Sequence, residues 1–127
     1  MFLVKEHVVP CQHIREYPQA TAHEQEDILR LAVKQYIPLD NQSPSPGDVT
    51  IVAAHANGFP KVGLTMEDCI RKCLVAWQET YEPLWEEILK RSKAYDLRIR
   101  SIWIADVAQQ GASGVLNEKL LGDEREF

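Results

Sequence analysis

The sequence has little cysteine, no long hydrophobic run and no excess of positive charge. Its 127 residues include three cysteines, and 14 Lys and Arg stand against 19 Asp and Glu, so the net charge is −5. Nucleic acids and anionic membranes are bound through clustered basic residues, and a negative chain excludes both as expected partners. No apolar run approaches the roughly 18 residues of a membrane span. The odd number of cysteines and the short apolar start MFLVKEHVVP predict an intracellular chain without disulfides.

What is present is the composition of an ordinary folded domain, 45% hydrophobic and 26% charged, at the length of one domain. Hydrophobic patterns predict strands over residues 28–39, 49–54 and 99–107, and an irregular strand or hairpin arm over 4–17. The segment DNQSPSPGD at 40–48 has the residues of a surface loop. Continuous apolar strands such as VTIVAA are typical of a parallel sheet with both faces buried.

The stretch between the last two predicted strands is helical in pattern. Met66–Gln78 has an apolar face, and Pro83–Tyr95 forms a second helix because proline is favoured in the first turn and costly in the interior. We expect Leu84, Trp85, Ile88 and Leu89 to point inward. Strand, helix and strand in this order predict an α/β fold with a right-handed crossover.

The segment HANGFP directly follows the predicted strand over 49–54 and is the best candidate for a catalytic role. In α/β hydrolases such a loop presents a backbone N–H to the substrate oxyanion, and small residues let the backbone approach closely. The candidate residues are Ala56, Asn57 and Gly58, with His55 immediately before them. The alternative is an ordinary turn in which Gly58 adopts a positive φ.

Two polar residues near the C-terminus are weaker candidates. Ser113 resembles a nucleophile elbow, but the elbow needs glycine two places later, where Val115 stands. We therefore predict a flexible loop at Ser113, followed by one helical turn over 116–121. Asp106, at the end of a predicted strand, either serves function or caps the following loop.

The metal-binding residue types are too scattered to predict a metal or cofactor site. Cys69 and Cys73 lie one turn apart on the predicted helix, but no His or further Cys completes a tetrahedral site. We interpret both as buried small hydrophobic residues. His7, His13 and His23 have no carboxylate or cysteine at a spacing that would indicate a functional site. They are predicted to lie on the surface.

Three segments resemble one known family: AAHANGFPK, YEPLWEEIL and IRSIWIADVAQQGASGVLNEKLLGDE. They resemble the opening third of the fungal toxin-biosynthesis and mycophenolic-acid acyl-CoA-hydrolase group, within the α/β-hydrolase superfamily. HVVPCQHIREYPQAT and LRLAVKQYIPLDN are similar to the N-terminal strands of the same group. The resemblance covers nearly the whole chain, and it implies an incomplete α/β-hydrolase sheet of about four strands with one or two crossover helices.

The resemblance also implies what the chain does. Members are Ser-His-Asp hydrolases of esters or thioesters, and several are peroxisomal. Their GHSxGG elbow would follow Phe127, so no triad residue is carried over; only the oxyanion loop at Ala56, Asn57 and Gly58 is, with His55 beside it. The expected function is the N-terminal part of a hydrolase for a small ester or acyl-CoA substrate, cytoplasmic or peroxisomal, needing no cofactor and inactive alone.

The alternative is a non-enzymatic α/β interaction module derived from a truncated hydrolase. Because the serine-bearing strand would be missing, we expect an open sheet edge and exposed Ile102, Trp103 and Ile104. Such an edge predicts self-association or aggregation.

Residues 62–78 depart from the family pattern within this partial domain. Relatives join GFPK almost directly to a segment like YEPLW, whereas here seventeen residues, VGLTMEDCIRKCLVAWQ, intervene. Every Val codon begins with GT and a Gln codon can be CAG, which are the ends of a spliceosomal intron. The hypothesis is that this segment is an insertion or a translated intron of 51 nucleotides.

Overall fold

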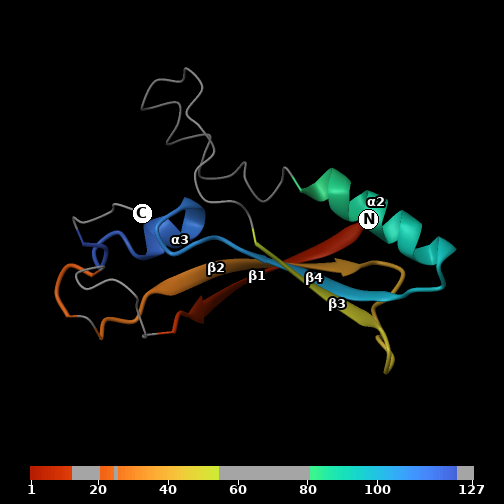
Figure 1. Cartoon of the computed structure of the whole chain (residues 1–127), viewed down its shortest axis with the longest axis horizontal. Helices are drawn as coiled ribbons and strands as arrows, with labels where there is room; N and C mark the ends of the chain where they lie inside the picture. The colour runs from red at the N-terminus through yellow and green to blue at the C-terminus, as the bar shows by residue number, and fades with distance from the viewer. Residues whose placement is uncertain (13–20, 25, 55–80, 123–127) are drawn as a thin grey trace, which may run out of the picture.

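The computed structural model describes residues 1–12, 21–24, 26–54 and 81–122. Its strands are β1 (Phe2–Pro10), β2 (Arg30–Pro38), β3 (Val49–Ala54) and β4 (Ile99–Ala105), and its helices are α2 (Glu82–Ala94) and α3 (Gly111–Leu116). The strands form one sheet in the order β1-β2-β4-β3 (Figure 1). This mixed sheet with helices confirms the α/β prediction and the three main strands. The predicted helix Met66–Gln78 lies outside the described residues.

The strand pairing combines an antiparallel start with one parallel pair. β1 pairs antiparallel with β2 over nine residues, whereas β4 pairs antiparallel with β2 only over Val33–Tyr36. β3 runs parallel to β4, from Val49 opposite Ile99 to Ala54 opposite Ala105. The two apolar strands are therefore neighbours, as predicted, and their carboxyl ends finish side by side.

Helix α2 covers the sheet with one narrow apolar stripe. Pro83 stands in its first turn, as predicted, and Trp85, Leu89 and Ser92 are its buried residues. Trp85 and Leu89 pack with side chains of β2 and β4, namely Tyr36, Ile99, Ile102 and Ile104. The prediction that Leu84 points inward is wrong, since its side chain is 48% exposed. Leu84 lies about 100° around the helix from Trp85, which turns it away from the sheet.

Burial in the sheet follows strand position more than strand composition. Ile102 and Ile104 are 0% and 1% exposed and Trp103 is half-buried, so the prediction that these three residues form an exposed patch is wrong. They are shielded because β4 lies between β2 and β3, beneath α2. β3 is the exposed strand: it lies at the edge of the described sheet, and Val52 is 81% exposed. The expectation of a β3 buried on both faces is therefore also wrong.

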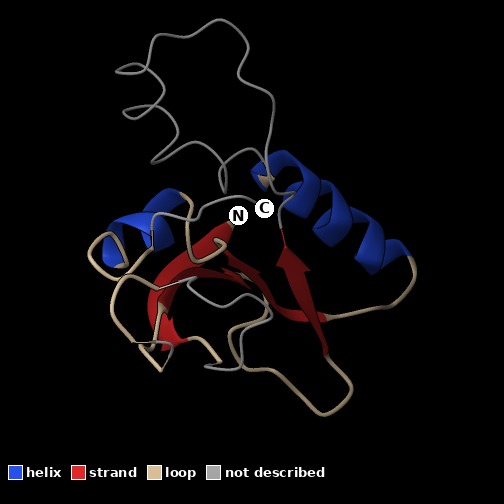
Figure 2. Cartoon of the chain, turned by 60° about the vertical axis from the view of Figure 1, so that its left-hand side comes forward, coloured by secondary structure: helices blue, strands red, loops and turns tan. Residues whose placement is uncertain are grey.

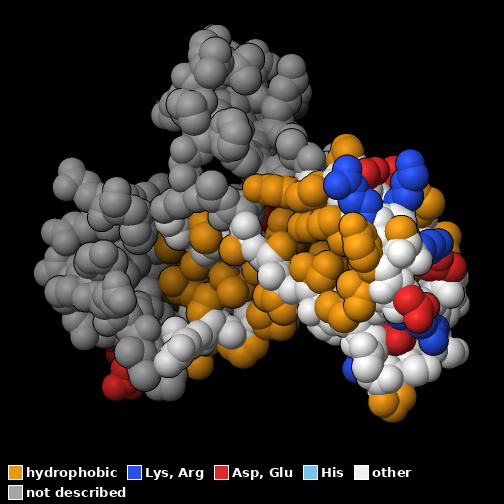
Figure 3. Space-filling view, turned by 45° about the vertical axis from the view of Figure 1, so that its right-hand side comes forward, with side chains coloured by type: hydrophobic (Ala, Val, Ile, Leu, Met, Phe, Trp, Pro, Cys, Tyr) orange, Lys and Arg blue, Asp and Glu red, His pale blue; other side chains and the backbone are white. Residues whose placement is uncertain are grey.

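Both described helices lie on the same side of the sheet (Figures 1 and 2). In Figure 3, hydrophobic side chains gather in the middle of the visible face, and charged side chains crowd one end of it. Among the described residues, no helix is long and apolar enough to cross a membrane.

The loop between β2 and β3 is held by one buried amide, that of Asn41. Its Nδ2 donates to Asp48 Oδ2 at 2.9 Å and to the Ile99 carbonyl at 3.0 Å. The bond from Asn41, followed by the bond from the Ser45 N–H, lowers the pKa of Asp48 below its ordinary value. The Asp48 carboxylate therefore stabilises this loop at neutral pH. Its contribution to the free energy of unfolding falls as acid protonates it.

The core arrangement predicts that alanine substitutions at two neighbouring residues of α2 lower the free energy of unfolding by unequal amounts. Trp85→Ala removes a ring that is 3% exposed, and we expect it to lower the free energy of unfolding by about 3–5 kcal/mol. Leu84→Ala, the matched control, should cost under about 1 kcal/mol because Leu84 is half exposed. Urea unfolding followed by circular dichroism measures both. Equal costs would contradict the position of α2 on the sheet.

Candidate functional site

The candidate site lies at the edge of the sheet where β3 and β4 end together. Ala54 and Ala105 are partners in the parallel register, so His55 and Asp106 are the first residues beyond two neighbouring strand ends. In open α/β sheets this is the edge where ligands bind. The predicted oxyanion residues Ala56, Asn57 and Gly58, together with His55, lie outside the described residues, so their role stays a prediction.

Asp106 caps the turn that follows β4. Its side chain is 5% exposed, and its Oδ2 accepts the Ala112 N–H at 2.9 Å, in the first turn of α3. Gly111 has φ +54°, and a Cβ there would lie 2.5 Å from Asp106 Oδ2, so glycine is required at this position. Of the two interpretations left open for Asp106, these contacts are those of the cap.

Ser113 is held in a helix, and the prediction of a flexible loop is wrong. It lies in α3 and is 0% exposed. Its Oγ accepts the Ala32 N–H at 2.8 Å and donates to the Asp106 carbonyl at 3.2 Å. This hydroxyl is hydrogen-bonded to the backbone both as acceptor and as donor, and it is shielded from solvent. The geometry agrees with the exclusion of Ser113 as a nucleophile.

Asn117 is the polar residue that the sequence analysis missed. It is 0% exposed, and its Oδ1 accepts the Arg30 N–H at 2.8 Å. Its Nδ2 donates to the Arg30 carbonyl at 2.7 Å, and to the carbonyls of Ala108 and Ser113 at 2.9 Å each. The side-chain amide therefore pairs with β2 in the way that a neighbouring strand would.

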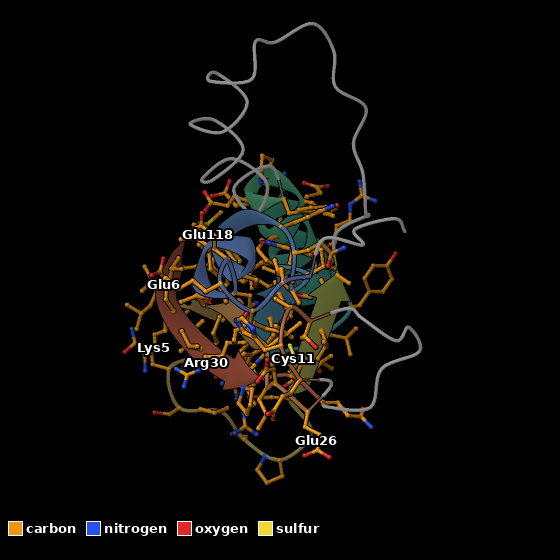
Figure 4. The ribbon with its side chains drawn as sticks, turned by 90° about the vertical axis from the view of Figure 1, so that its left-hand side faces the viewer. Lys5, Glu6, Cys11, Glu26, Arg30 and Glu118 are labelled. Atoms are coloured by element: carbon orange, nitrogen blue, oxygen red, sulfur yellow. The ribbon has the colours of Figure 1, made fainter. Side chains whose placement is uncertain are left out.

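These contacts complete the hydrogen bonding of β2 where β4 stops. β4 reaches β2 only over Val33–Tyr36; beyond it, the Asp106 N–H donates to the Ala32 carbonyl at 3.1 Å. Ser113 and Asn117 then satisfy the backbone of Ala32 and Arg30. Figure 4 shows this end of the molecule, with Arg30 on β2 and Glu118 just after α3. The prediction of a helical turn over 116–121 is displaced, because α3 spans Gly111–Leu116.

A signal for this helix is present in the small residues GASG at 111–114. A Cβ at Gly114 would lie 2.9 Å from the Gln109 carbonyl oxygen, so only glycine allows the chain to pass this close. Close packing of α3 on β2 brings the hydroxyl and amide of Ser113 and Asn117 within reach of the strand backbone. The small residues permit this close packing, whereas the partners of Ser113 and Asn117 lie on β2 and are not indicated by the local sequence.

The remaining candidates from the sequence analysis are three histidines and two cysteines. His7 is half-buried, contrary to the surface prediction: its Nε2 lies 3.0 Å from Gln35 Oε1 and its ring centroid lies 5.0 Å from that of Trp103. His23 is exposed, as predicted. His13, Cys69 and Cys73 lie outside the described residues. Where the structure is described, no group of three or more His, Cys, Asp or Glu is placed to hold a metal ion.

Comparison with known proteins finds relatives among fungal thioesterases. The chain is 43% identical over 121 residues to the type I acyl-CoA thioesterase mpaH of Penicillium roqueforti and 42% identical to mpaH' of Penicillium brevicompactum. Each match covers 94% of this chain and 23% of the relative, so the chain spans about a quarter of the length of the curated relatives it matches. No protein-family model matches the chain.

Among solved structures, the fold matches the peroxisomal alpha-beta-hydrolase Lpx1 of Saccharomyces cerevisiae with a TM-score of 0.52 and 17% identity. The match covers 98% of this chain and 28% of Lpx1. The sheet therefore has the fold of part of an α/β hydrolase. The resemblance seen in the sequence is confirmed: the chain is homologous to an N-terminal portion of the fungal type I acyl-CoA thioesterases.

The pairing of α3 with β2 predicts a large effect of a single polar residue. Asn117→Ala removes four side-chain hydrogen bonds to backbone groups of Arg30, Ala108 and Ser113, and we expect it to lower the free energy of unfolding by at least about 2 kcal/mol. Glu118→Ala, at the exposed neighbouring position, is the matched control and should change stability by under about 0.5 kcal/mol. Chemical denaturation measures both. An Asn117→Ala variant as stable as the parent would contradict the role of the amide.

Proposed function

We propose that this chain provides the oxyanion-loop portion of a hydrolase that cleaves an acyl-CoA thioester or a related ester in the cytoplasm or the peroxisome. The observation that supports the proposal is the parallel register of Ala54 with Ala105, because HANG follows Ala54 in the sequence and ligands bind beyond the carboxyl ends of parallel strands. The 40–43% identity to acyl-CoA thioesterases supports the thioester as the substrate class.

The chemistry of the proposed loop is charge stabilisation. When a nucleophile attacks a thioester carbonyl, its oxygen becomes an oxyanion, and a fixed backbone N–H lowers the energy of that charge. Ala56 and Gly58 leave room for the substrate beside the backbone, and Asn57 keeps its own N–H donor. The acyl group is then transferred to the nucleophile while the thiolate leaves, which requires a serine and a base that match no position among these 127 residues.

The 127-residue chain alone is inactive in this proposal. The Ser113 hydroxyl is buried and hydrogen-bonded to two backbone groups, as described above. Ser101 is 3% exposed, and its Oγ accepts the indole N–H of Trp103 at 2.9 Å. In the described part of the chain, neither of these buried serines is open to substrate. Oxyanion donors without a nucleophile stabilise a charge that never forms.

A chimera tests the proposed loop. Residues 1–127 replace the matched quarter of an mpaH thioesterase, and acyl-CoA hydrolysis is followed by the release of free thiol. The chimera should hydrolyse acyl-CoA. Asn57→Pro removes the backbone donor and should lower kcat by about 10²–10³. The Asn57→Ala chimera keeps the N–H and should retain most of its activity.

The isolated 127-residue chain, assayed beside the chimera, should show no turnover of acyl-CoA or p-nitrophenyl ester. Turnover by the isolated chain that a serine-directed inhibitor abolishes would contradict its proposed inactivity. An inactive parent chimera that nevertheless folds, or an Asn57→Pro chimera as active as Asn57→Ala, would contradict the role of the loop.

We also propose that residues 62–78 are an insertion that the hydrolase fold does not need. The strands and helices of the described sheet lie before or after this segment in the chain. A chain lacking 62–78 should unfold at the same denaturant concentration as the parent or a higher one. A clear loss of cooperative unfolding would overturn this proposal. Sequencing of the mature transcript tests separately whether the 51 nucleotides are an intron.

A further inference from the structure

The loop between β2 and β3 contains two serines, each followed directly by a proline: Ser43-Pro44 and Ser45-Pro46. All four residues are exposed. Proline immediately after the serine is the feature by which one class of protein kinases, the proline-directed kinases, recognises its substrates. A hydroxyl is phosphorylated only where a kinase can reach it, so the exposed dipeptides make both serines candidate phosphate acceptors.

The backbone around Ser45 has a shape that suits a kinase substrate. The Asp48 N–H donates to the Ser45 carbonyl at 3.1 Å, Pro46 is the second residue of this turn, and the third, Gly47, has φ +98°. These are the features of a type II β-turn, whose second residue has extended backbone angles of about −60° and +120°. Kinases bind their substrates as extended chains, and Pro46 is already extended here. The bend lies one residue further on, at glycine, which changes its φ at the least cost.

Arg98, just before β4, distinguishes Ser45 from Ser43. Its Nη1 lies 3.5 Å from the Ser45 Oγ. Its Nη2 donates to Asn41 Oδ1 at 2.5 Å, and its Nε lies 3.8 Å from Asp48 Oδ1, so the loop itself holds the guanidinium beside Ser45. Among the described residues, no Lys or Arg side chain hydrogen-bonds to Ser43. A phosphate on Ser45 would therefore form next to the side chain that binds phosphate best, since a guanidinium donates two parallel hydrogen bonds to it.

We propose that Ser45 is a phosphorylation site for a proline-directed protein kinase and that Arg98 binds the resulting phosphate. The phosphoryl donor is ATP. The Ser45 Oγ forms a bond to the γ-phosphorus, the bond from this phosphorus to the β,γ-bridging oxygen breaks, ADP leaves, and the hydroxyl proton passes to a carboxylate base of the kinase.

The charges around Ser45 determine how the phosphate is held. It adds a charge of about −1.5 to −2 at pH 7, which Arg98 attracts and the Asp48 carboxylate repels. Arg100 is close enough for its charge to help lower the pKa of Asp48, so it favours the phosphate as well. With three oxygens and the larger charge, the phosphate replaces Asp48 as the main anionic partner of Arg98. This site goes beyond the proposed function, because the loop precedes β3 whereas the candidate oxyanion segment follows it.

Phosphorylation of the full 127-residue chain tests the acceptor. The folded chain is incubated with a purified proline-directed kinase and ATP, and mass spectrometry locates the phosphate. The parent should carry phosphate at Ser45, and Pro46→Ala should carry none there. Pro44→Ala is the matched control: it removes only the dipeptide of Ser43, and its Ser45 should be phosphorylated as in the parent. Circular dichroism confirms that each variant is folded.

A phosphorus NMR titration tests the role of Arg98, in a Ser43→Ala background so that one phosphate gives one signal. The second pKa of a phosphoserine is about 6. A guanidinium beside it stabilises the dianion, so Arg98→Gln should raise this pKa by about 0.5 or more relative to the phosphorylated parent. Arg91→Gln changes the net charge equally and is the matched control. Arg91 pairs with Glu87 on α2, and its loss should leave the phosphoserine pKa unchanged.

The two experiments leave the proposal open to refutation at each step. It is overturned by a folded parent that takes no phosphate at Ser45, by a Pro46→Ala variant phosphorylated there like the parent, or by a Pro44→Ala variant that is not. It is also overturned by a phosphoserine pKa that Arg98→Gln does not raise, or that Arg91→Gln raises equally. None of these outcomes depends on the activity of the chimera.

Discussion

The hydrogen bonds from Ser113 and Asn117 to the first residues of β2 are the interaction on which the candidate site at this edge of the sheet depends. β4 ends too early to pair with Arg30 and Ala32, which would leave backbone groups of a central strand unsatisfied. Asn117 and Ser113 satisfy them with side-chain atoms. A buried group without a partner costs about 1–3 kcal/mol, so these two side chains determine whether this end of the sheet closes.

The same contacts fix the position at which the candidate loop begins. Asp106 belongs to the network through its N–H, its carbonyl and its carboxylate, and it directly follows β4. The end of β4 is therefore held against β2, and the parallel register carries this constraint to Ala54 at the end of β3. The predicted oxyanion segment starts from the next residue, so its starting point is set by side chains far away in the sequence.

The elements with strong local signals could be predicted from the sequence. The apolar runs of β3 and β4 and the position of Pro83 identified two strands and a helix, and the quoted segments identified the hydrolase resemblance. α3 was misplaced because its six residues are too few to show a helical period. The burial of β3 was mispredicted because a continuous apolar run does not reveal whether a strand lies at the centre or the edge of a sheet. The roles of Ser113 and Asn117 depend on contacts more than 80 residues away, which no local pattern encodes.

β3 therefore meets two requirements with six residues. Its inner side must pair in register with β4, since this pairing sets where HANG begins, and the exposed outer side is free of any charge that would prevent a further strand from joining. A strand edge accepts only one neighbour, so a single further strand can extend the sheet there. A strand joining there would satisfy the outward-facing backbone groups of β3 and cover Val52, as β4 satisfies the groups on the inner side.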